Sequence, residues 1–377
     1  MSATPAYVQV SAPPKLAGLA LPVAIVGILT AVAGIFISGQ LGWAGALVGV
    51  TFGVQIALGA AFLCAISLVT GAKWWRGIAD VPARVSQLII VPSLLVLVVL
   101  GLGYGQLFEW ANPEAAEHKH FVHLKHAWLN VPFFLGRAVF YVVAWTLLIK
   151  VMSGRILAVN DQPRSAGWAR MGGFAAFFIV CYALLQSAAW WDWLMSVEVV
   201  WFNTMQGVYG FSGSFVAGIA AVTIATIHRT GRGEGKLKVG QLHDLAKFLF
   251  AFQFFWAYIW FCQFMLTWYA NIPEEIIYYQ SRINGGWEIL FLLNPIINFV
   301  LPFAILMSQR TKKRPELVLR MAWLALFGRV FDLWLCVGPT YDTSPYAPIW
   351  AFAAAIGVGS LMAWWYGRSL PGLKTAS

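Results

Sequence analysis

Charge is scarce in this sequence. Only 11% of the 377 residues are Asp, Glu, Lys or Arg, whereas 60% are hydrophobic, and the hydrophobic residues come in long blocks. A water-soluble fold has too little interior to bury that much apolar surface, so the composition excludes a soluble globular domain. The sequence therefore predicts an all-α, polytopic membrane protein.

Cysteine is also rare. The four cysteines lie far apart inside apolar segments, and no C-x-x-C or C-x-x-C-H motif is present: Cys64, Cys181, Cys262 and Cys336. Such spacing supplies neither a disulfide framework, nor ligands for a metal cluster, nor an attachment site for covalent haem. We therefore expect no covalently bound cofactor on this chain.

Histidine is missing from the predicted membrane segments. His228 and His243 stand only at segment ends, which argues against bis-histidine haem ligation within the membrane. The other four of the six histidines share one loop, where their spacing permits a metal but no companion cysteine supports one: His118, His120, His123 and His126. We predict no metal site.

Apolar segments long enough to cross a bilayer dominate what remains. A helix rises about 1.5 Å per residue, so roughly 20 residues cross a hydrocarbon layer of about 30 Å. The first apolar run is too long for the core of a signal peptide, and we retain it as a helix. Ten segments result: 17–38, 43–70, 85–108, 131–152, 170–190, 201–227, 245–270, 287–308, 317–338 and 347–366.

Basic and acidic residues occupy alternate loops. Lys and Arg follow the second, fourth, sixth and eighth segments, whereas the loops between these carry acids such as Glu109, Glu198 and Glu274. Loops rich in Lys and Arg face the cytoplasm, which predicts that both termini are cytoplasmic. The net charge of +10 is therefore a sign of topology, and we expect no nucleic-acid partner.

Small residues and prolines mark helix packing. Glycines recur every four residues at Gly45, Gly49 and Gly53, and Gly210, Ser214 and Gly218 share that spacing. Small residues let helix backbones approach closely, which favours packing within the chain over a dimer face. Four prolines are predicted to kink or start helices: Pro82, Pro92, Pro295 and Pro302.

Ionisable residues within the membrane concentrate in its outer half. Arg329 and Asp332 lie one turn apart on the ninth segment, and Arg137 lies near the outer start of the fourth. Charges at membrane depth are costly, so each is a candidate functional residue. Two interpretations stay open: Arg329 and Asp332 neutralise each other, or the cluster lines a cavity for protons or a quinol headgroup. The outer-half candidates are Asp332, Arg329, Arg137, Glu288, Gln186, Asp192 and Glu198.

A second polar group marks the cytoplasmic side. His228, His243 and Asp244 gather where the sixth segment ends and the seventh begins. Histidine titrates near neutral pH, so these residues are candidates for an inner proton entry. The alternative is a solvated helix terminus, in which Asp244 is favourable near the first turn.

Several stretches together resemble a known family of membrane subunits. They are KHAWLNVPFF at 125–134 with Arg137, DWLMSVE at 192–198, GVYGF at 207–211, HDLAK at 243–247 and WYANIPEE at 268–275. The chain resembles the NrfD-like, polysulfide-reductase-type membrane subunits. It is most similar to the second quinone-binding membrane subunit (ActF-type) of bacterial alternative complex III.

The resemblance covers about residues 15–368 and implies an arrangement of the ten helices. A cytoplasmic segment is followed by a peripheral helix, two four-helix bundles (helices 2–5 and 6–9), and a peripheral tenth helix with a cytoplasmic C-terminus. The corresponding ranges are 1–16, 17–42, 43–193, 194–340 and 341–377. The implied location is the bacterial inner membrane.

The resemblance also implies a function and partners. The expected complex is a quinol:cytochrome c oxidoreductase that transfers electrons from quinol at the outer face to other subunits. Expected partners are a sister NrfD-like subunit, a periplasmic iron–sulfur subunit, multihaem and monohaem cytochromes c, lipids, and a quinol such as menaquinol. Haem c and the iron–sulfur clusters belong to those subunits, so this chain is a quinone-site or non-catalytic subunit that contributes quinol binding, proton translocation or both. A secondary transporter and a purely structural anchor are the alternatives.

Overall fold

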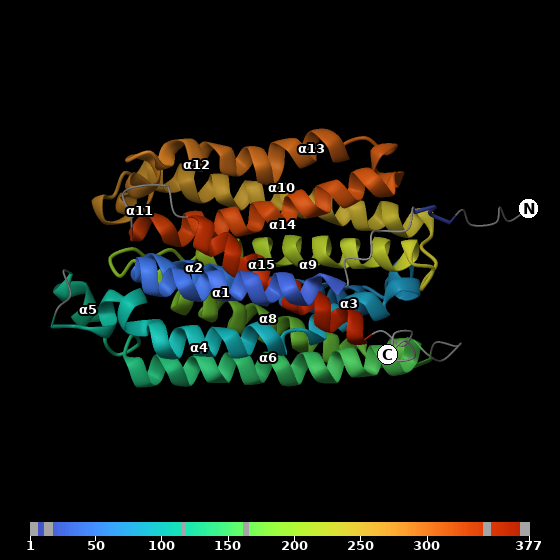
Figure 1. Cartoon of the computed structure of the whole chain (residues 1–377), viewed down its shortest axis with the longest axis horizontal. Coiled ribbons are helices and arrows are strands. Elements are labelled where there is room, and N and C mark those ends of the chain that lie inside the picture. Colours follow the sequence, from blue (N-terminus) through green and yellow to red (C-terminus); the bar gives the residue numbers. More distant parts are fainter. Residues whose placement is uncertain (1–6, 11–17, 115–117, 161–165, 342–347, 370–377) are drawn as a thin grey trace, which may run out of the picture.

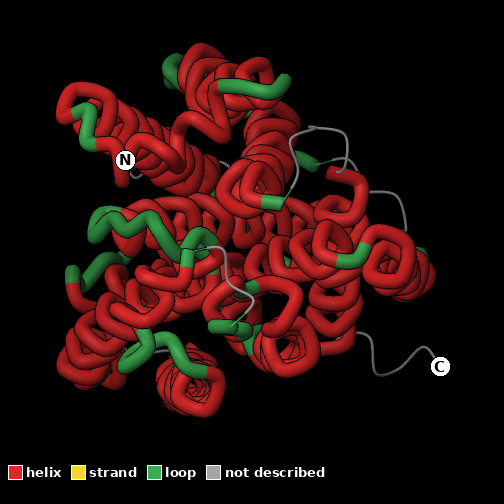
Figure 2. Tube along the Cα trace, turned by 90° about the vertical axis from the view of Figure 1, so that its left-hand side faces the viewer, coloured by secondary structure: helices red, strands yellow, loops and turns green. Residues whose placement is uncertain are grey.

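The computed structural model describes residues 7–10, 18–114, 118–160, 166–341 and 348–369. Within them, ten helical spans are long and apolar enough to cross a membrane, which confirms the predicted all-α membrane fold. The spans lie side by side along the long axis (Figure 1). Figure 2 shows most of them end-on. The predicted division into two bundles stays a prediction. Most of the predicted segment 1–16, together with residues 342–347 and 370–377 of the predicted last segment, lies outside the described residues.

The helices follow the chain with short connections. They are α1 (Ala20–Ser38), α2 (Gln40–Val69), α3 (Asp80–Gln87), α4 (Ile90–Leu107), α5 (Lys119–Lys125), α6 (Val131–Asn160), α7 (Ala166–Arg170), α8 (Gly172–Trp193), α9 (Gln206–Gly231), α10 (Val239–Ala270), α11 (Pro273–Ile283), α12 (Trp287–Pro295), α13 (Leu301–Leu306), α14 (Pro315–Val337) and α15 (Pro348–Ser369). Helices α3 and α4 form one span, and α12 and α13 form another with the π-helical turn η5 (Ile296–Val300) between them.

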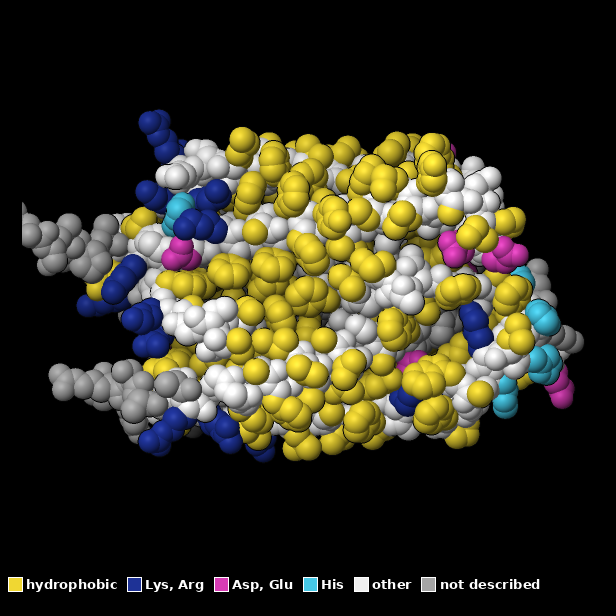
Figure 3. Space-filling model, turned by 180° about the vertical axis from the view of Figure 1, so that it is seen from behind, with side chains coloured by type: hydrophobic (Ala, Val, Ile, Leu, Met, Phe, Trp, Pro, Cys, Tyr) yellow, Lys and Arg dark blue, Asp and Glu magenta, His cyan; other side chains and the backbone are white. Residues whose placement is uncertain are grey.

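The two ends of the bundle carry opposite charge. Lys and Arg side chains gather at one end, acids and histidines at the other, and a broad apolar surface lies between them (Figure 3). We call them the basic end, which includes the loops that carry Lys73, Lys236 and Lys313, and the acidic end, which includes Glu109 and Glu274. The apolar surface is of the kind that faces lipid. Which end faces the cytoplasm stays a prediction from the distribution of Lys and Arg.

Helices α2, α9 and α14 form the interior. Of their most apolar stretches, 89%, 83% and 78% of the residues are buried inside the protein. Glycine permits the closest approach: a Cβ added to Gly59 would lie 1.9 Å from the carbonyl oxygen of Ser214, and one on Gly218 would lie 2.2 Å from the carbonyl carbon of Gly59. The predicted small-residue stripes also pack internally, because Gly45 and Gly49 face α15. Lipid provides no hydrophobic driving force for helices to associate, so van der Waals contact between closely packed backbones stabilises the bundle instead.

The eighth span is interrupted beside a polar cluster. Pro295 lacks the N–H that a regular helix needs, and the π-helical turn follows it directly. The Asn298 side chain donates to the Asn294 carbonyl at 3.2 Å and so provides a partner at the irregular turn. The seventh span, α10, ends regularly. Its C-cap residue Asn271 adopts the left-handed conformation (φ 49°), and Pro273 begins α11.

Candidate functional site

A buried carboxylate, Asp332 on α14, is the centre of the candidate site near the acidic end. It is 3% exposed, and its Oδ1 accepts hydrogen bonds from the Tyr209 hydroxyl and from Asn294 Nδ2, the latter at 2.8 Å. Its Oδ2 accepts from Arg329 Nη1 at 3.1 Å, the pair predicted from the i,i+3 spacing. Three separate spans, α9, α12 and α14, thus converge on one carboxylate.

Arg329 is held by the interrupted span as well as by Asp332. Its Nε donates to Asn298 Oδ1 at 3.2 Å, and its guanidinium carbon lies 4.4 Å from the ring centre of Trp256 on α10. Asn298 in turn donates to Asn294 Oδ1 at 2.7 Å. The π-helical turn therefore places both asparagines toward α14, and a cation–π contact holds the other side of the guanidinium.

A small cavity adjoins Asp332. Its volume is about 20 Å³, and its walls come from α9, α10, α11, α12 and α14. A cavity of this size holds about one water molecule when polar groups surround it. The lining is mixed polar and aromatic and consists of Tyr209, Trp260, Gln263, Tyr278, Tyr279, Arg282, Phe291, Asn294, Asp332, Leu335 and Cys336.

Arg282 on α11 is part of the cavity wall. It donates to the carbonyl oxygens of Leu335 at 2.9 Å and Cys336 at 2.7 Å, so it satisfies carbonyls in the last turn of α14. Its Nη1 also forms an ion pair with Glu198 at 3.4 Å. The ring of Tyr278 lies 3.3 Å below the guanidinium, and burial raises the pKa of that hydroxyl well above its usual value. Arg282 thus ties α11 to α14.

The second buried ion pair, Arg137 with Asp192, forms a separate cluster. Asp192 is 1% exposed and accepts from Arg137 Nε at 2.7 Å and Nη2 at 2.9 Å. Its two oxygens also accept from the Tyr141 hydroxyl and from Trp128 Nε1, both at 2.8 Å. A carboxylate has about four acceptor positions, so Asp192 is saturated. This arrangement clamps α6 to the end of α8 and leaves no position for another donor.

Two further predicted outer-half residues, Glu288 and Gln186, lie away from both clusters. The Glu288 side chain is exposed, and its Oε2 accepts from the Gly286 N–H at 2.8 Å at the start of α12. Gln186 is buried on α8 against the first turns of α9, where its amide faces the backbone of Gly207 and Phe211. Both residues therefore support helix ends, and Glu198 contacts the lining of the cavity through its ion pair with Arg282.

At the basic end, no hydrogen bond or ion pair joins His228, His243 and Asp244 to one another among the described residues. Asp244 instead pairs with Lys247 at 3.0 Å. The Nε2 of His243 is buried and has no hydrogen-bond partner within the described ranges. The three predicted residues thus share an end of the bundle but do not form one hydrogen-bonded cluster.

Comparison with known proteins adds no family assignment. No family model matches the chain, and no curated protein matches it. Within the described part of the chain, no group of three His, Cys, Asp or Glu residues is placed to hold a metal ion. The site is therefore interpreted from its own geometry.

Reasoning from the sequence missed three residues of the site: Tyr209, Asn298 and Arg282. A signal for Arg282 was present, because it is an arginine in a connection whose other charges, Glu274 and Glu275, are acidic. A signal for Asn298 was its i,i+4 spacing from Asn294 on an apolar segment that also contains Pro295. Tyr209 gave no such signal, since its neighbours in the sequence are small or apolar.

Proposed function

We propose that this chain is an integral membrane subunit of a quinol-oxidising respiratory complex, in which Asp332 takes up and passes on protons released near the acidic end. Oxidation of a quinol releases its hydroxyl protons together with an electron pair, so a proton acceptor must lie within reach. One observation carries the proposal: Asp332 is a buried carboxylate that borders a cavity with room for one water.

Asp332 suits proton exchange better than Asp192 does. Asp332 receives hydrogen bonds from Tyr209, Asn294 and Arg329, which leaves about one acceptor position toward the cavity. Asp192 has no remaining position, because four donors occupy its oxygens. A group that exchanges protons needs a route to water, so the saturated pair is assigned a structural role.

The size of the cavity favours proton transfer over direct quinol binding. Pockets for organic ligands span roughly 300–1,000 Å³, whereas the cavity beside Asp332 holds about 20 Å³. A quinol headgroup therefore docks outside this cavity, against the surface of this chain or in the sister subunit. In that arrangement Asp332 receives the proton through water or through the Tyr209 hydroxyl.

Buried polar groups between Asp332 and the basic end support an inner continuation of this route. Gln253 is 2% exposed on α10, and neither its Nε2 nor its Oε1 has a hydrogen-bond partner among the described residues. Gln55 on α2 is 3% exposed, and its Oε1 also has no partner among those residues. Buried amides of this kind are satisfied by water in most proteins. Gln253 lies ten residues from His243, about 15 Å along the helix.

The resemblance to NrfD-like subunits completes the proposal. It supplies the partners that the electrons require: a sister membrane subunit, a periplasmic iron–sulfur subunit and cytochromes c that hold the haem c. It also supplies the location in a bacterial inner membrane with both ends of the chain in the cytoplasm. The alternation of basic and acidic loops supports this orientation.

A secondary transporter is the second candidate, because one observation favours it. The eighth span is interrupted at Pro295 and η5, directly beside an ionisable pair, and broken helices beside charged groups line transporter sites. Transport requires no redox partner, whereas proton release from quinol does. Identification of the proteins that co-purify with this chain therefore distinguishes the two functions.

Purification through a tag on this chain, in mild detergent, is the first test. A c-type haem band in the redox difference spectrum, together with co-purifying iron–sulfur and sister subunits, is the expected result. A colourless chain without partners would overturn the respiratory proposal and favour the transporter.

Substitution of the central carboxylate tests the role of the site. In the intact complex, Asp332→Asn is expected to lower quinol oxidation by roughly a hundredfold, the usual scale for loss of a proton acceptor. Asp332→Glu should retain part of the activity with a shifted pH profile. Glu316→Gln, an exposed residue on the same helix, is the matched control and should leave the rate unchanged. Full activity of Asp332→Asn in an assembled complex would refute the assignment.

A further inference from the structure

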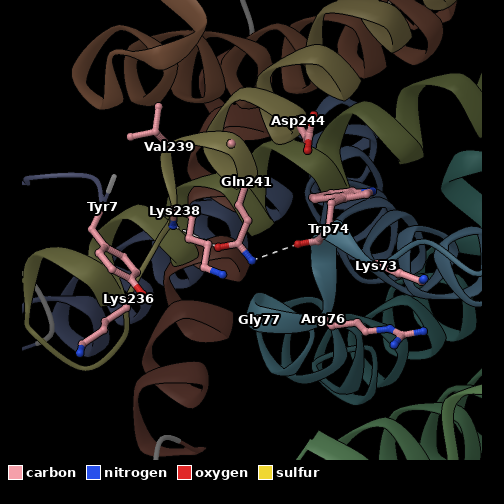
Figure 4. A pocket seen from close by; sticks show the side chains of 11 residues that line it. Tyr7, Lys73, Trp74, Arg76, Gly77, Lys236, Lys238, Val239, Gln241 and Asp244 are labelled. Atoms are coloured by element: carbon pink, nitrogen blue, oxygen red, sulfur yellow. Dashed lines mark hydrogen bonds between the residues drawn. The ribbon is translucent and has the colours of Figure 1, made fainter. Parts of the chain in front are cut away.

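A large pocket at the basic end is separate from the Asp332 site. Its volume is about 620 Å³, within the range of ligand-binding pockets. Figure 4 shows its residues: Lys236 and Lys238 lie on one side of a hydrogen bond between Gln241 and Trp74, and Lys73 and Arg76 lie on the other. The pocket therefore opens between the connection that follows α2 and the connection that precedes α10.

Specific contacts build this pocket from distant parts of the chain. Gln241, 8% exposed, donates from Nε2 to the Trp74 carbonyl at 3.0 Å and accepts from the Lys238 N–H at 3.1 Å. Near Tyr7, the Val8 N–H donates to the Leu237 carbonyl at 2.9 Å, which places the Tyr7 ring at the rim. Trp74 stacks on Phe248 of α10 at 5.6 Å between ring centres. These contacts fix the walls of the pocket.

The charges in the pocket are unbalanced. Lys73, Arg76, Lys236 and Lys238 line it, whereas its one acid, Asp244, pairs with Lys247. Among the described residues, no carboxylate lies within ion-pair distance of any of the four cations. The Nε of Arg76 is buried and has no hydrogen-bond partner in the part of the chain that the structure describes.

Two other cations at this end of the bundle have partners within the chain. Arg229 pairs with Asp80, and Arg84 donates to the Ser369 carbonyl at 2.6 Å. Like charges held close together repel each other, and an anion placed among them removes that cost.

We propose that this pocket binds the phosphate group of an anionic molecule. Phosphate oxygens accept several charge-assisted hydrogen bonds, which Lys and Arg side chains from two sides would donate. Trp74 and Tyr7 provide the aromatic surface that commonly lies at the level of lipid headgroups, and basic pockets among transmembrane helices bind anionic headgroups. The same chemistry fits a soluble phosphate ester, so the experiment below separates the two sources. This proposal does not depend on quinol oxidation.

Binding to the purified protein tests the site directly. Native mass spectrometry in neutral detergent would count bound dioleoylphosphatidylglycerol and, in parallel, dioleoylphosphatidylcholine. The test variant Lys73→Gln/Lys236→Gln removes one exposed cation from each side of the pocket. The control Lys313→Gln/Arg314→Gln removes two exposed cations from the same end but outside the pocket. Glycerol 3-phosphate and inorganic phosphate serve as soluble competitors.

The expected result is selective binding of the anionic lipid, weakened on the order of tenfold or more in the test variant and little changed in the control. Failure of the soluble competitors to displace it identifies a lipid headgroup as the ligand. Displacement by glycerol 3-phosphate or phosphate identifies a soluble phosphate compound and equally supports a phosphate site. Equal binding of both lipids, or equal weakening in both variants, would overturn the proposal.

Discussion

The substitution Gly328→Ala isolates the packing that holds Arg329 in place. A Cβ at this position of α14 would lie 2.3 Å from Asn298 Oδ1, 2.8 Å from its Cγ and 3.1 Å from its Nδ2. The added methyl group must therefore displace the Asn298 amide. That amide accepts from Arg329 Nε at 3.2 Å and donates to the Gly328 carbonyl at 3.1 Å. The side chain can move only by giving up these bonds.

Opposing contributions decide the magnitude. Alanine is favoured over glycine inside a helix by about 1 kcal/mol. Overpacking a tight core costs roughly 1–3 kcal/mol, and loss of a hydrogen bond to a charged group adds about 1.5–3 kcal/mol. The net expectation is a destabilisation of roughly 1.5–5 kcal/mol, with part of the Asp332-dependent activity lost as Arg329 shifts.

The assay is thermal or denaturant unfolding of the purified protein, compared with Gly101→Ala on α4. A Cβ at Gly101 meets no atom within 4 Å, so this control should be neutral or slightly stabilised. The double variant Gly328→Ala/Asn298→Ala should recover part of the loss, because it removes the group that the methyl displaces. If Gly328→Ala proves as stable as Gly101→Ala, the reasoning about the crowded helix contact is refuted.

Three further outcomes are expected. Asp192→Asn should lower the free energy of unfolding by roughly 3–5 kcal/mol, because it leaves the Arg137 charge buried and unpaired; an unchanged melting temperature would contradict this. Gln253→Leu should be neutral or stabilising in unfolding assays, yet should slow proton movement across vesicles that hold the complex; unchanged proton movement would exclude Gln253 from the route. The third concerns pH, because burial holds the pKa of the Tyr278 hydroxyl well above 10.0 in the folded protein. The stability that the neutral hydroxyl contributes is therefore complete below about pH 10 and is lost as the pH rises further. Tyr278→Phe should therefore flatten the alkaline decline measured by unfolding at pH 9 to 11, and an identical decline would contradict the assignment.

The position of a residue along the axis of the bundle was predictable from the sequence, but the direction in which its side chain points was not. Counting residues from the loops placed Asp332, Arg329 and Glu288 at similar depth, and the i,i+3 spacing paired the first two correctly. Glu288 instead faces outward, because the spans are apolar on both their lipid-facing and their buried sides and so carry little directional pattern. The pairing of Arg137 with Asp192 was not predictable either, because contacts between helices distant in the sequence depend on packing that no local spacing specifies.

The interrupted eighth span was predictable only in part from its proline. Pro295 predicted a disturbance of the helix, and the structure places a π-helical turn there. The sequence did not indicate that the extra residue in the turn would direct Asn298 toward Arg329. That outcome depends on the space left by Gly328 on a different helix.

The contacts of Arg282 have a consequence for water access to the carboxylate. Helix α11 lies outside the membrane spans, yet Tyr278, Tyr279 and Arg282 on it form part of the cavity wall, and Arg282 holds the last carbonyls of α14. A small rigid-body displacement of this surface helix would therefore change the cavity volume and the orientation of the α14 terminus together. The structure thus couples the space available for water beside Asp332 to the position of α11, a helix that belongs to none of the ten spans.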